Sequence, residues 1–281
     1  FGRRICAANV ATSDRSRLAE LSERPLKIGH REAAALPVRH RLFRAQTIEI
    51  DRYIEIGAVE GAGEARAAGR NAIGTDMNPL AVLMSRVKAN PLNPEKIKKH
   101  WNFLHPAIDA MTSQKNLQLH DRLEFWFKPK VKRDLDRIWR VIEGVYPEVG
   151  DPYGDFFRII FSSTLRKVSS NRTNEFKRYR LAEADLKAYN PDTIKEFTRT
   201  YEIGLAGMSE LHKIANSMHE TRVVRADARH YTSLPKADLI VTSPPYGDSK
   251  TTVAYGQFSS FSIDWMKLQD MSPLALDNAL L

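Results

Sequence analysis

The sequence contains one cysteine, Cys6, among 281 residues. A single cysteine can form neither an internal disulfide nor a CxxC metal knot, and it is typical of a reducing, cytoplasmic setting. No apolar run reaches the roughly 18 residues of a membrane-spanning helix, and the first residues lack the apolar core of a signal peptide. We therefore expect a cytoplasmic protein with no membrane association. The eight histidines show no HxxxH or Cys/His spacing, so we also expect no bound metal.

Acidic residues are outnumbered in this chain. Its 34 aspartates and glutamates stand against 43 lysines and arginines, which gives a formal net charge of +9. An excess of this sign suits a polyanionic partner such as nucleic acid, although an ordinary basic protein has the same balance. With 42% hydrophobic residues, the chain can bury a core of its own. The phosphate-loop pattern GxxxxGK[ST] is missing, so nucleotide binding of that kind is not supported.

Strand and helix patterns alternate after residue 46. In order, the predicted elements are strands at 47–50 and 53–56, a helix at 64–69 closed by Gly69, a strand at 71–76 and a helix at 79–89. This βαβα succession predicts a parallel sheet. Residues 12–36 have a helical composition that is interrupted by Pro25 and Gly29.

The middle of the chain, from about 98 to 219, has mainly helical periodicity with scattered aromatic residues. Strand patterns return at 222–227 and at 237–242. A helical block thus interrupts the α/β pattern. We interpret the block as an insertion, because the sheet needs the strands on both of its flanks.

The most specific local pattern is the segment Thr242-Ser243-Pro244-Pro245-Tyr246, directly after the apolar strand ADLIV. The two prolines stop the strand and stiffen the loop, because neither can donate a ladder hydrogen bond. In an open α/β sheet, ligands bind at this carboxyl edge. The competing interpretation is a rigid Pro-Pro turn followed by a buried tyrosine.

Ser-Pro-Pro-Tyr after an apolar strand resembles the catalytic motif of amino-group DNA methyltransferases. The runs at 242–262 and 69–92 are similar to a branch of bacterial and phage site-specific enzymes, and the resemblance covers most of residues 50–266. It implies a Rossmann-like, S-adenosylmethionine-dependent methyltransferase sheet with a large helical insertion between the second and third strands. It also implies double-stranded DNA as the substrate and, as a possible partner, a cognate restriction endonuclease.

With that resemblance, the chain divides into four parts. We expect an N-terminal helical extension at 1–46, a cofactor-binding half at 47–97, the helical insertion at 98–219 and a catalytic half at 220–281. The insertion has two interpretations, target recognition on DNA or bracing of the fold. Few residues follow Tyr246, whereas the sheet of the family continues with further strands, so we expect residues beyond this sequence or within 1–50 to supply them.

The chemistry of amino methylation explains the residue types at 243–246. An exocyclic base amine is a poor nucleophile, because its lone pair is delocalised into the ring. The Ser243 hydroxyl and the Pro244 carbonyl could each accept one of its N–H groups and free the lone pair for attack on the cofactor methyl. Pro245 stiffens the turn, and Tyr246 would stack on the base after it leaves the duplex. No cysteine nucleophile is needed, which argues against C5-cytosine methylation.

The segment from Glu55 to Gly63 resembles the acidic, glycine-rich loop that holds S-adenosylmethionine, and Glu55, Gly57 and Gly61 are its matching residues. Val59 stands where the family has its middle glycine, so the loop departs from the pattern. A catalytically weak DNA-binding specificity subunit is the alternative that this departure suggests.

Three further polar residues are expected at the cofactor. Asp76 ends the next strand about 20 residues after Glu55, the spacing at which an acid reaches ribose hydroxyls; the competing role is a cap of the helix at 79–89. Asn78 fits either role. Asp227, at the end of the third strand, would accept from the adenine amine, and a surface turn is its competing interpretation.

A basic cluster is expected to contact DNA phosphates and some base edges. Its members are Arg166, Lys167, Arg172, Lys177, Arg178 and Arg180. The competing interpretation is a solvated helix end. Residues 255–258 read as a glycine- and serine-containing loop that either closes over the base or is buried.

The expected reaction is methyl transfer from S-adenosylmethionine to the N4 amine of cytosine, after base flipping. By resemblance, the serine that leads the motif favours cytosine N4 over adenine N6, which is the nearest alternative. Methylation of RNA or of a protein glutamine is a third possibility, because the same motif geometry can hold other planar amides and amines.

Overall fold

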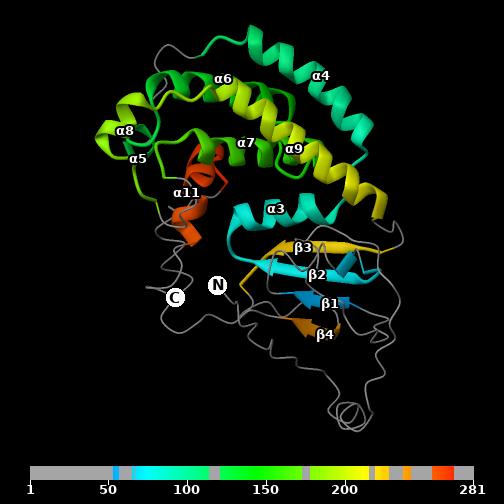
Figure 1. Cartoon of the computed structure of the whole chain (residues 1–281). Helices are drawn as coiled ribbons and strands as arrows, with labels where there is room; N and C mark the ends of the chain where they lie inside the picture. Colours follow the sequence, from blue (N-terminus) through cyan, green and yellow to red (C-terminus); the bar gives the residue numbers. More distant parts are fainter. Residues whose placement is uncertain are drawn as a thin grey trace, which may run out of the picture.

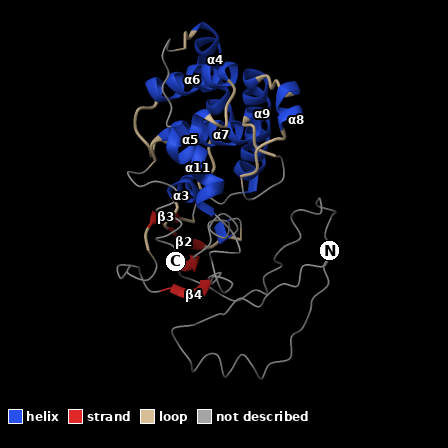
Figure 2. Cartoon of the chain, turned by 90° about the vertical axis from the view of Figure 1, so that its left-hand side faces the viewer, coloured by secondary structure: helices blue, strands red, loops and turns tan. Residues whose placement is uncertain are grey.

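The chain is a mixed α/β protein that is mostly helical, with a small parallel sheet. The computed structural model describes residues 53–56, 65–66, 68–113, 121–172, 178–214, 219–227, 237–241 and 255–268. The sheet forms one layer, and most of the helices lie on one side of it (Figures 1 and 2). No helix within the described ranges is long and apolar enough to cross a membrane. The predicted extension at 1–46 and strand at 47–50 lie outside the described residues.

The sheet has four parallel strands in the order β3-β2-β1-β4. They are β1 Tyr53–Ile56, β2 Asn71–Asp76, β3 Thr221–Arg225 and β4 Ala237–Val241. The second strand is confirmed at its predicted bounds. The third begins one residue earlier than predicted and ends at Arg225, so Asp227 follows the strand instead of ending it. In this order, β3 and β4 are the two edge strands of the described sheet.

Gly69 turns the chain into β2. It has a positive φ of 72°, a conformation that glycine adopts without steric cost. The N–H of Gly69 donates to the carbonyl of Arg66, and the N–H of Arg70 donates to the carbonyl of Ala65, each at 2.9 Å. This bond pair is the Schellman motif of a helix end. Gly69 therefore closes a helical turn, as its position in the sequence predicts.

Helix α3, Pro79–Ala89, lies between the sheet and the other helices (Figure 1). Its bounds agree with the sequence prediction. Val82 and Ala89 pack with Val223 of β3. On the other side, Leu80, Leu83 and Val87 belong to the core of the helical layer. Burial of these last three side chains contributes about 5–9 kcal/mol, comparable to the whole stability of a domain, about 5–15 kcal/mol. Helix α3 therefore joins the helical layer to the sheet, because its two sides belong to different core clusters.

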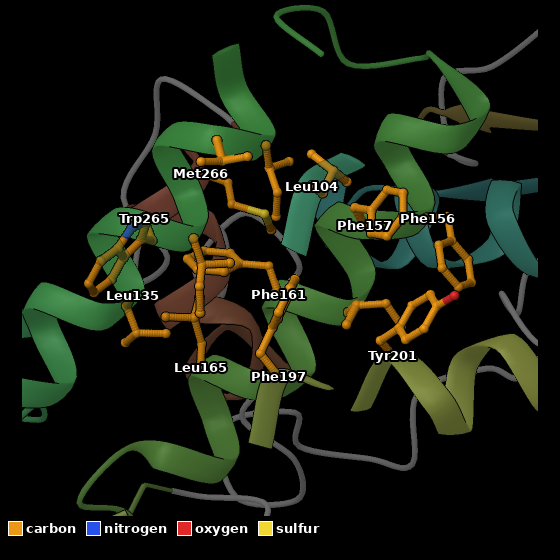
Figure 3. Close-up of a cluster of buried hydrophobic side chains, with 14 of the residues drawn as sticks. Leu104, Leu135, Phe156, Phe157, Phe161, Leu165, Phe197, Tyr201, Trp265 and Met266 are labelled. Carbon is orange, nitrogen blue, oxygen red and sulfur yellow. The ribbon is translucent and has the colours of Figure 1, made fainter. Parts of the chain in front are cut away.

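Among the described residues, six helices separate α3 from β3 in the sequence. They are α4 Pro94–Ala110, α5 Asp121–Glu124, α6 Pro129–Val145, α7 Pro152–Val168, α8 Glu183–Ala188 and α9 Thr193–Ile214. Helix α7 contacts α3, α6, α9 and the later helix α11, so it is the centre of this layer. Phe157, Phe161 and Leu165 of α7 are fully buried and lie amid the aromatic cluster that Figure 3 draws.

Helix α11, Tyr255–Met266, corrects the loop predicted at 255–258. It packs against α7 and α3, and its Trp265 and Met266 enter the core (Figure 3). The glycine and serine content suggested a loop, but the serine hydroxyls are bonded in the helical structure: Ser260 donates to the Gln257 carbonyl, and Ser262 bonds Ser162 of α7 at 2.6 Å. Small side chains here allow close approach between helices.

Close packing of α9 on α7 predicts opposite effects for two alanine substitutions in the same helix. A Cβ added at Gly204 would come within 3.3 Å of Phe156 Cζ and closer still to Ile160 Cδ1, whereas nothing lies within 4 Å of one added at Gly207. Gly207→Ala should raise the free energy of unfolding by about 0.5–1 kcal/mol through helix propensity. Gly204→Ala should lower it by about 1 kcal/mol, because overpacking costs about 1–3 kcal/mol. Urea denaturation measures both, and a stabilised Gly204→Ala would contradict the close packing.

Candidate active site

Strands β1 and β4 end side by side at the carboxyl edge of the sheet. Ile56 pairs with Val241, and Ile56 also pairs with Gly74 of β2. The strand order reverses between β1 and β4, and in open parallel sheets the crevice at such a reversal is where ligands bind. We therefore expect the ligand site predicted at the carboxyl edge to lie where β1 and β4 end.

Several predicted site residues follow these two strand ends in the sequence. Gly57 and Gly61 come after Ile56, and the predicted catalytic residues Ser243, Pro244, Pro245 and Tyr246 come after Val241. All six lie outside the described residues. Glu55 is the third residue of β1, and its backbone pairs with Ile73 and Ile240.

Asp76 is the last residue of β2 and is half-buried at the edge. Its Oδ1 accepts a hydrogen bond from the Asn78 N–H at 2.7 Å. Burial raises the pKa of the Asp76 carboxyl above its ordinary value, and the backbone N–H groups of Asn78 and Met77 oppose that rise. These donors hold the carboxylate at the start of the turn. The competing role of Asp76 as the cap of α3 is wrong, because Asn78 is the capping residue.

Asn78 uses both ends of its side-chain amide inside the protein. Its Oδ1 accepts from the N–H groups of Leu80 and Ala81, at 3.0 and 3.4 Å. Its Nδ2 donates to the Ser259 hydroxyl of α11 at 2.9 Å, in a buried position. Asn78 thus starts α3 and also ties α11 to the edge where β2 ends. Sequence reasoning missed Ser259, because nothing local links two residues that lie 181 positions apart.

Asp227 lies close to Asp76, just beyond the end of β3. The N–H of Ala226 donates to the Asp76 carbonyl at 3.1 Å, so the pairing of β2 and β3 continues past Arg225. Asp227 is half-buried. The structure thus brings together two of the predicted cofactor residues at one edge. Within the described ranges, no group of three or more His, Cys, Asp or Glu side chains could hold a metal ion.

The predicted DNA-binding residues do not share one environment. Lys167 forms an ion pair with Glu196 of α9 at 2.9 Å and donates to Thr200. Arg166, Arg178 and Arg180 instead lie over aromatic rings. Arg172 is exposed. Lys177 lies outside the described residues.

The double use of Asn78 predicts an energetic coupling with Ser259. Ser259→Ala should lower the free energy of unfolding by about 1–3 kcal/mol, because the Asn78 amide donor stays buried without this acceptor. Asn78→Ala should lower it by about 1–3 kcal/mol through loss of both the cap and the bond. The double variant should fall short of the sum by about 0.5–1.5 kcal/mol.

Asn93 supplies the matched control for this cycle. It caps α4 through the N–H groups of Glu95 and Lys96 in an exposed position. Asn93→Ala should lower the free energy of unfolding by about 1 kcal/mol, and in the double variant with Ser259→Ala the two effects should add. Denaturant titration of the three single and two double variants gives each free energy of unfolding. Additive effects of Asn78→Ala and Ser259→Ala would contradict the coupling.

Comparison with known proteins agrees with the resemblance of the Ser-Pro-Pro-Tyr motif to methyltransferases. No known protein-family profile matches the chain, and no solved structure matches it. The chain is 37% identical over 236 residues to the type II methyltransferase M.MvaI of Kocuria varians. The matching region is 78% of this chain and 51% of the relative, so the chain spans about half the length of the curated relative it matches. The chain is therefore, over most of its own length, a homologue of a type II methyltransferase.

Proposed function

We propose that the chain forms the cofactor-binding and catalytic part of an S-adenosylmethionine-dependent DNA methyltransferase that modifies the N4 amine of cytosine. One observation carries the proposal: Ile56 and Val241 pair at the strand-order reversal. The glycine-rich segment and the Ser-Pro-Pro-Tyr segment therefore follow neighbouring strand ends in the sequence. The homology to a type II methyltransferase supports the same reaction class.

The fold in this proposal is a Rossmann-like methyltransferase sheet. The order β3-β2-β1-β4 is the order in the first half of doubly wound nucleotide-binding sheets, where the ligand lies across the switch point. The helical layer enters between β2 with its helix α3 and β3. This arrangement fits an insertion between the second and third strands.

The chemistry of the edge fits the cofactor. S-adenosylmethionine carries ribose hydroxyls, an adenine amine and a methyl group on a sulfonium centre, and it supplies that methyl group. Asp76 and Asp227 bring carboxylates to adjacent strand ends, where they can accept from hydroxyl and amine donors. Glu55, Gly57 and Gly61 belong to the segment at the end of β1, where glycines let the backbone approach a ligand closely. Asn78 serves as a positioning residue, because its amide is committed to α3 and Ser259.

The residues after β4 prepare the target amine. The Ser243 hydroxyl and the Pro244 carbonyl each accept one N–H of the amine, so that its lone pair points away from the ring. Pro245 keeps the segment rigid, which limits the entropy lost when the base enters. Tyr246 stacks on the flipped base. Basic residues of the helical layer, among them Arg172 and Arg180, neutralise DNA phosphates, and a restriction endonuclease with the same target sequence is the partner that this function implies.

Alanine substitution in the catalytic segment tests the reaction. Ser243→Ala and Pro244→Ala should each reduce N4-methylcytosine in DNA by at least roughly 100-fold, the size of effect expected when positioned hydrogen bonds to a transition state are lost. Mass spectrometry of digested DNA measures the product and separates N4-methylcytosine from N6-methyladenine. Affinity for S-adenosylmethionine should persist in both variants, and undiminished methylation would overturn the assignment.

Substitution of Asp76 tests the cofactor half separately. Asp76→Ala removes a charge-assisted hydrogen bond of about 1.5–3 kcal/mol, so the Kd for S-adenosylmethionine should rise by about 10- to 100-fold. Asp109→Ala, an exposed change on α4, supplies the control and should leave the Kd unchanged. Calorimetric titration gives both values. Equal affinities in the two variants would exclude Asp76 from the cofactor site.

A further inference from the structure

Residues 170–172, at the end of α7, lie beside residues 178–181. The Arg172 N–H donates to the Tyr179 carbonyl at 2.7 Å, and the Leu181 N–H donates to the Ser170 carbonyl at 2.8 Å. Asn171 and Arg180 form an antiparallel bridge, and the Asn171 Oδ1 accepts from the Tyr179 N–H at 2.8 Å. These bonds hold residues 170–172 and 178–181 in a fixed register. Arg172, Arg178 and Arg180 lie on these two paired segments.

The arginines are set on aromatic rings that other elements supply. Arg180 Cζ lies 3.9 Å from the ring centre of Phe125, which follows α5. Arg178 Cζ lies 5.4 Å from the rings of both Trp126 and Phe261. Arg166 of α7 lies 4.0 Å from the ring centre of Phe258 in α11. We call this surface the arginine–aromatic face; its residues are Phe125, Trp126, Arg166, Arg172, Arg178, Arg180 and Phe258, and Phe261 is buried beneath it.

Two large rings of this face are open to solvent. The exposed fraction is 51% for Phe125 and 40% for Phe258. A guanidinium over an aromatic ring is attracted by the ring, yet its N–H donors lie in its own plane and can still bond a phosphate. The ring also limits the rotation of the arginine, which lowers the entropy lost when a phosphate binds.

Two cations of α7 and α9 are paired with a carboxylate. Lys167 and Arg199 both lie within ion-pair distance of Glu196. For Arg172 and Arg180, no carboxylate lies within that distance in the part of the chain that the structure describes.

The face is continuous with the edge of the sheet. Helix α11 carries Phe258 and Phe261, and the adjacent Ser259 bonds Asn78 at the start of α3. Figure 1 shows α11 beside α7, near the start of α3 toward which the strands point. A long polyanion bound at the edge of the sheet could therefore continue along α11 toward Arg172 and Arg180.

We propose that the arginine–aromatic face holds duplex DNA beside the target base, with Arg172 and Arg180 on phosphates and Phe125 as the platform that orients Arg180. This inference rests on the proposed function and deepens it. It names which of the basic residues bind DNA, and it assigns Lys167 to the ion pair with Glu196 instead. It also adds Phe125 to the binding surface.

Anisotropy titration of a labelled duplex at several salt concentrations tests the face. Arg180→Ala should weaken binding by about 5- to 10-fold and lower the salt slope by about one. Arg180→Lys keeps the charge but not the planar donor set, so it should retain the slope and restore only part of the affinity. Phe125→Leu should weaken binding by about 2- to 5-fold with the slope unchanged, because it removes only the platform.

Arg199→Ala is the matched control, since it removes the same charge from α9 at a residue paired with Glu196. It should leave the affinity and the salt slope close to those of the unsubstituted protein. Equal losses in Arg180→Ala and Arg199→Ala would mean that only net charge matters, and would overturn the proposal.

The methylation assay separates this proposal from the function on which it depends. If the unsubstituted protein methylates DNA and Arg180→Ala keeps the same KM for DNA, the face is wrong while the function stands. If the unsubstituted protein methylates no DNA at all, the proposed function fails. Tighter binding of a single-stranded RNA than of the duplex, lost on Arg180→Ala, would overturn the choice of duplex DNA.

Discussion

The packing of α3 on both of its sides is the constraint on which the rest of the structure depends. One side of the helix rests on β3 through Val82 and Ala89, and the other side carries Leu80 and Leu83 into the helical core. Neither layer can leave α3 without exposing apolar surface worth several kcal/mol. The sheet edge and the helical layer therefore keep a fixed position relative to each other, which a binding site formed by both would require.

Asn78 links the end of β2, the start of α3 and helix α11. It lies between Asp76, at the end of β2, and α3, and its amide reaches Ser259 of α11. Helix α11 follows the Ser-Pro-Pro-Tyr segment in the sequence. The hydrogen bonds of Asn78 therefore fix the position of α11 relative to Asp76 at the end of β2. The carboxylates gather at the strand ends, whereas the arginines gather on the helical layer beside α11. That separation of charge suits a cofactor with hydroxyl and amine donors on one side and a polyanion on the other.

Local patterns predicted the elements near the sheet well. Pro79–Ala89 is helical at its predicted bounds, β2 is a strand at its predicted bounds, and Gly69 has the positive φ of a helix end. The prediction failed at 255–258, where glycine and serine suggested a loop. In the helix that forms there, the hydroxyls of Ser260 and Ser262 are bonded within α11 and to α7, and Phe261 and Trp265 are buried. Tertiary packing overrides local propensity in such cases. The assignment of Asp76 to a possible cap failed because Asn78, two residues later, fits the cap geometry better.

The sequence by itself determined the alternation of strands and helices, the proline-rich stop after β4 and the excess of positive charge. These are local or additive properties: hydrophobic period, backbone restriction at proline and glycine, and summed charge. Only the tertiary structure decided the strand order, the pairing of Ile56 with Val241, the bond between Asn78 and Ser259 and the setting of Arg180 on Phe125. Each of these joins residues that are far apart in the chain, and their interaction energy arises only when the whole core has packed.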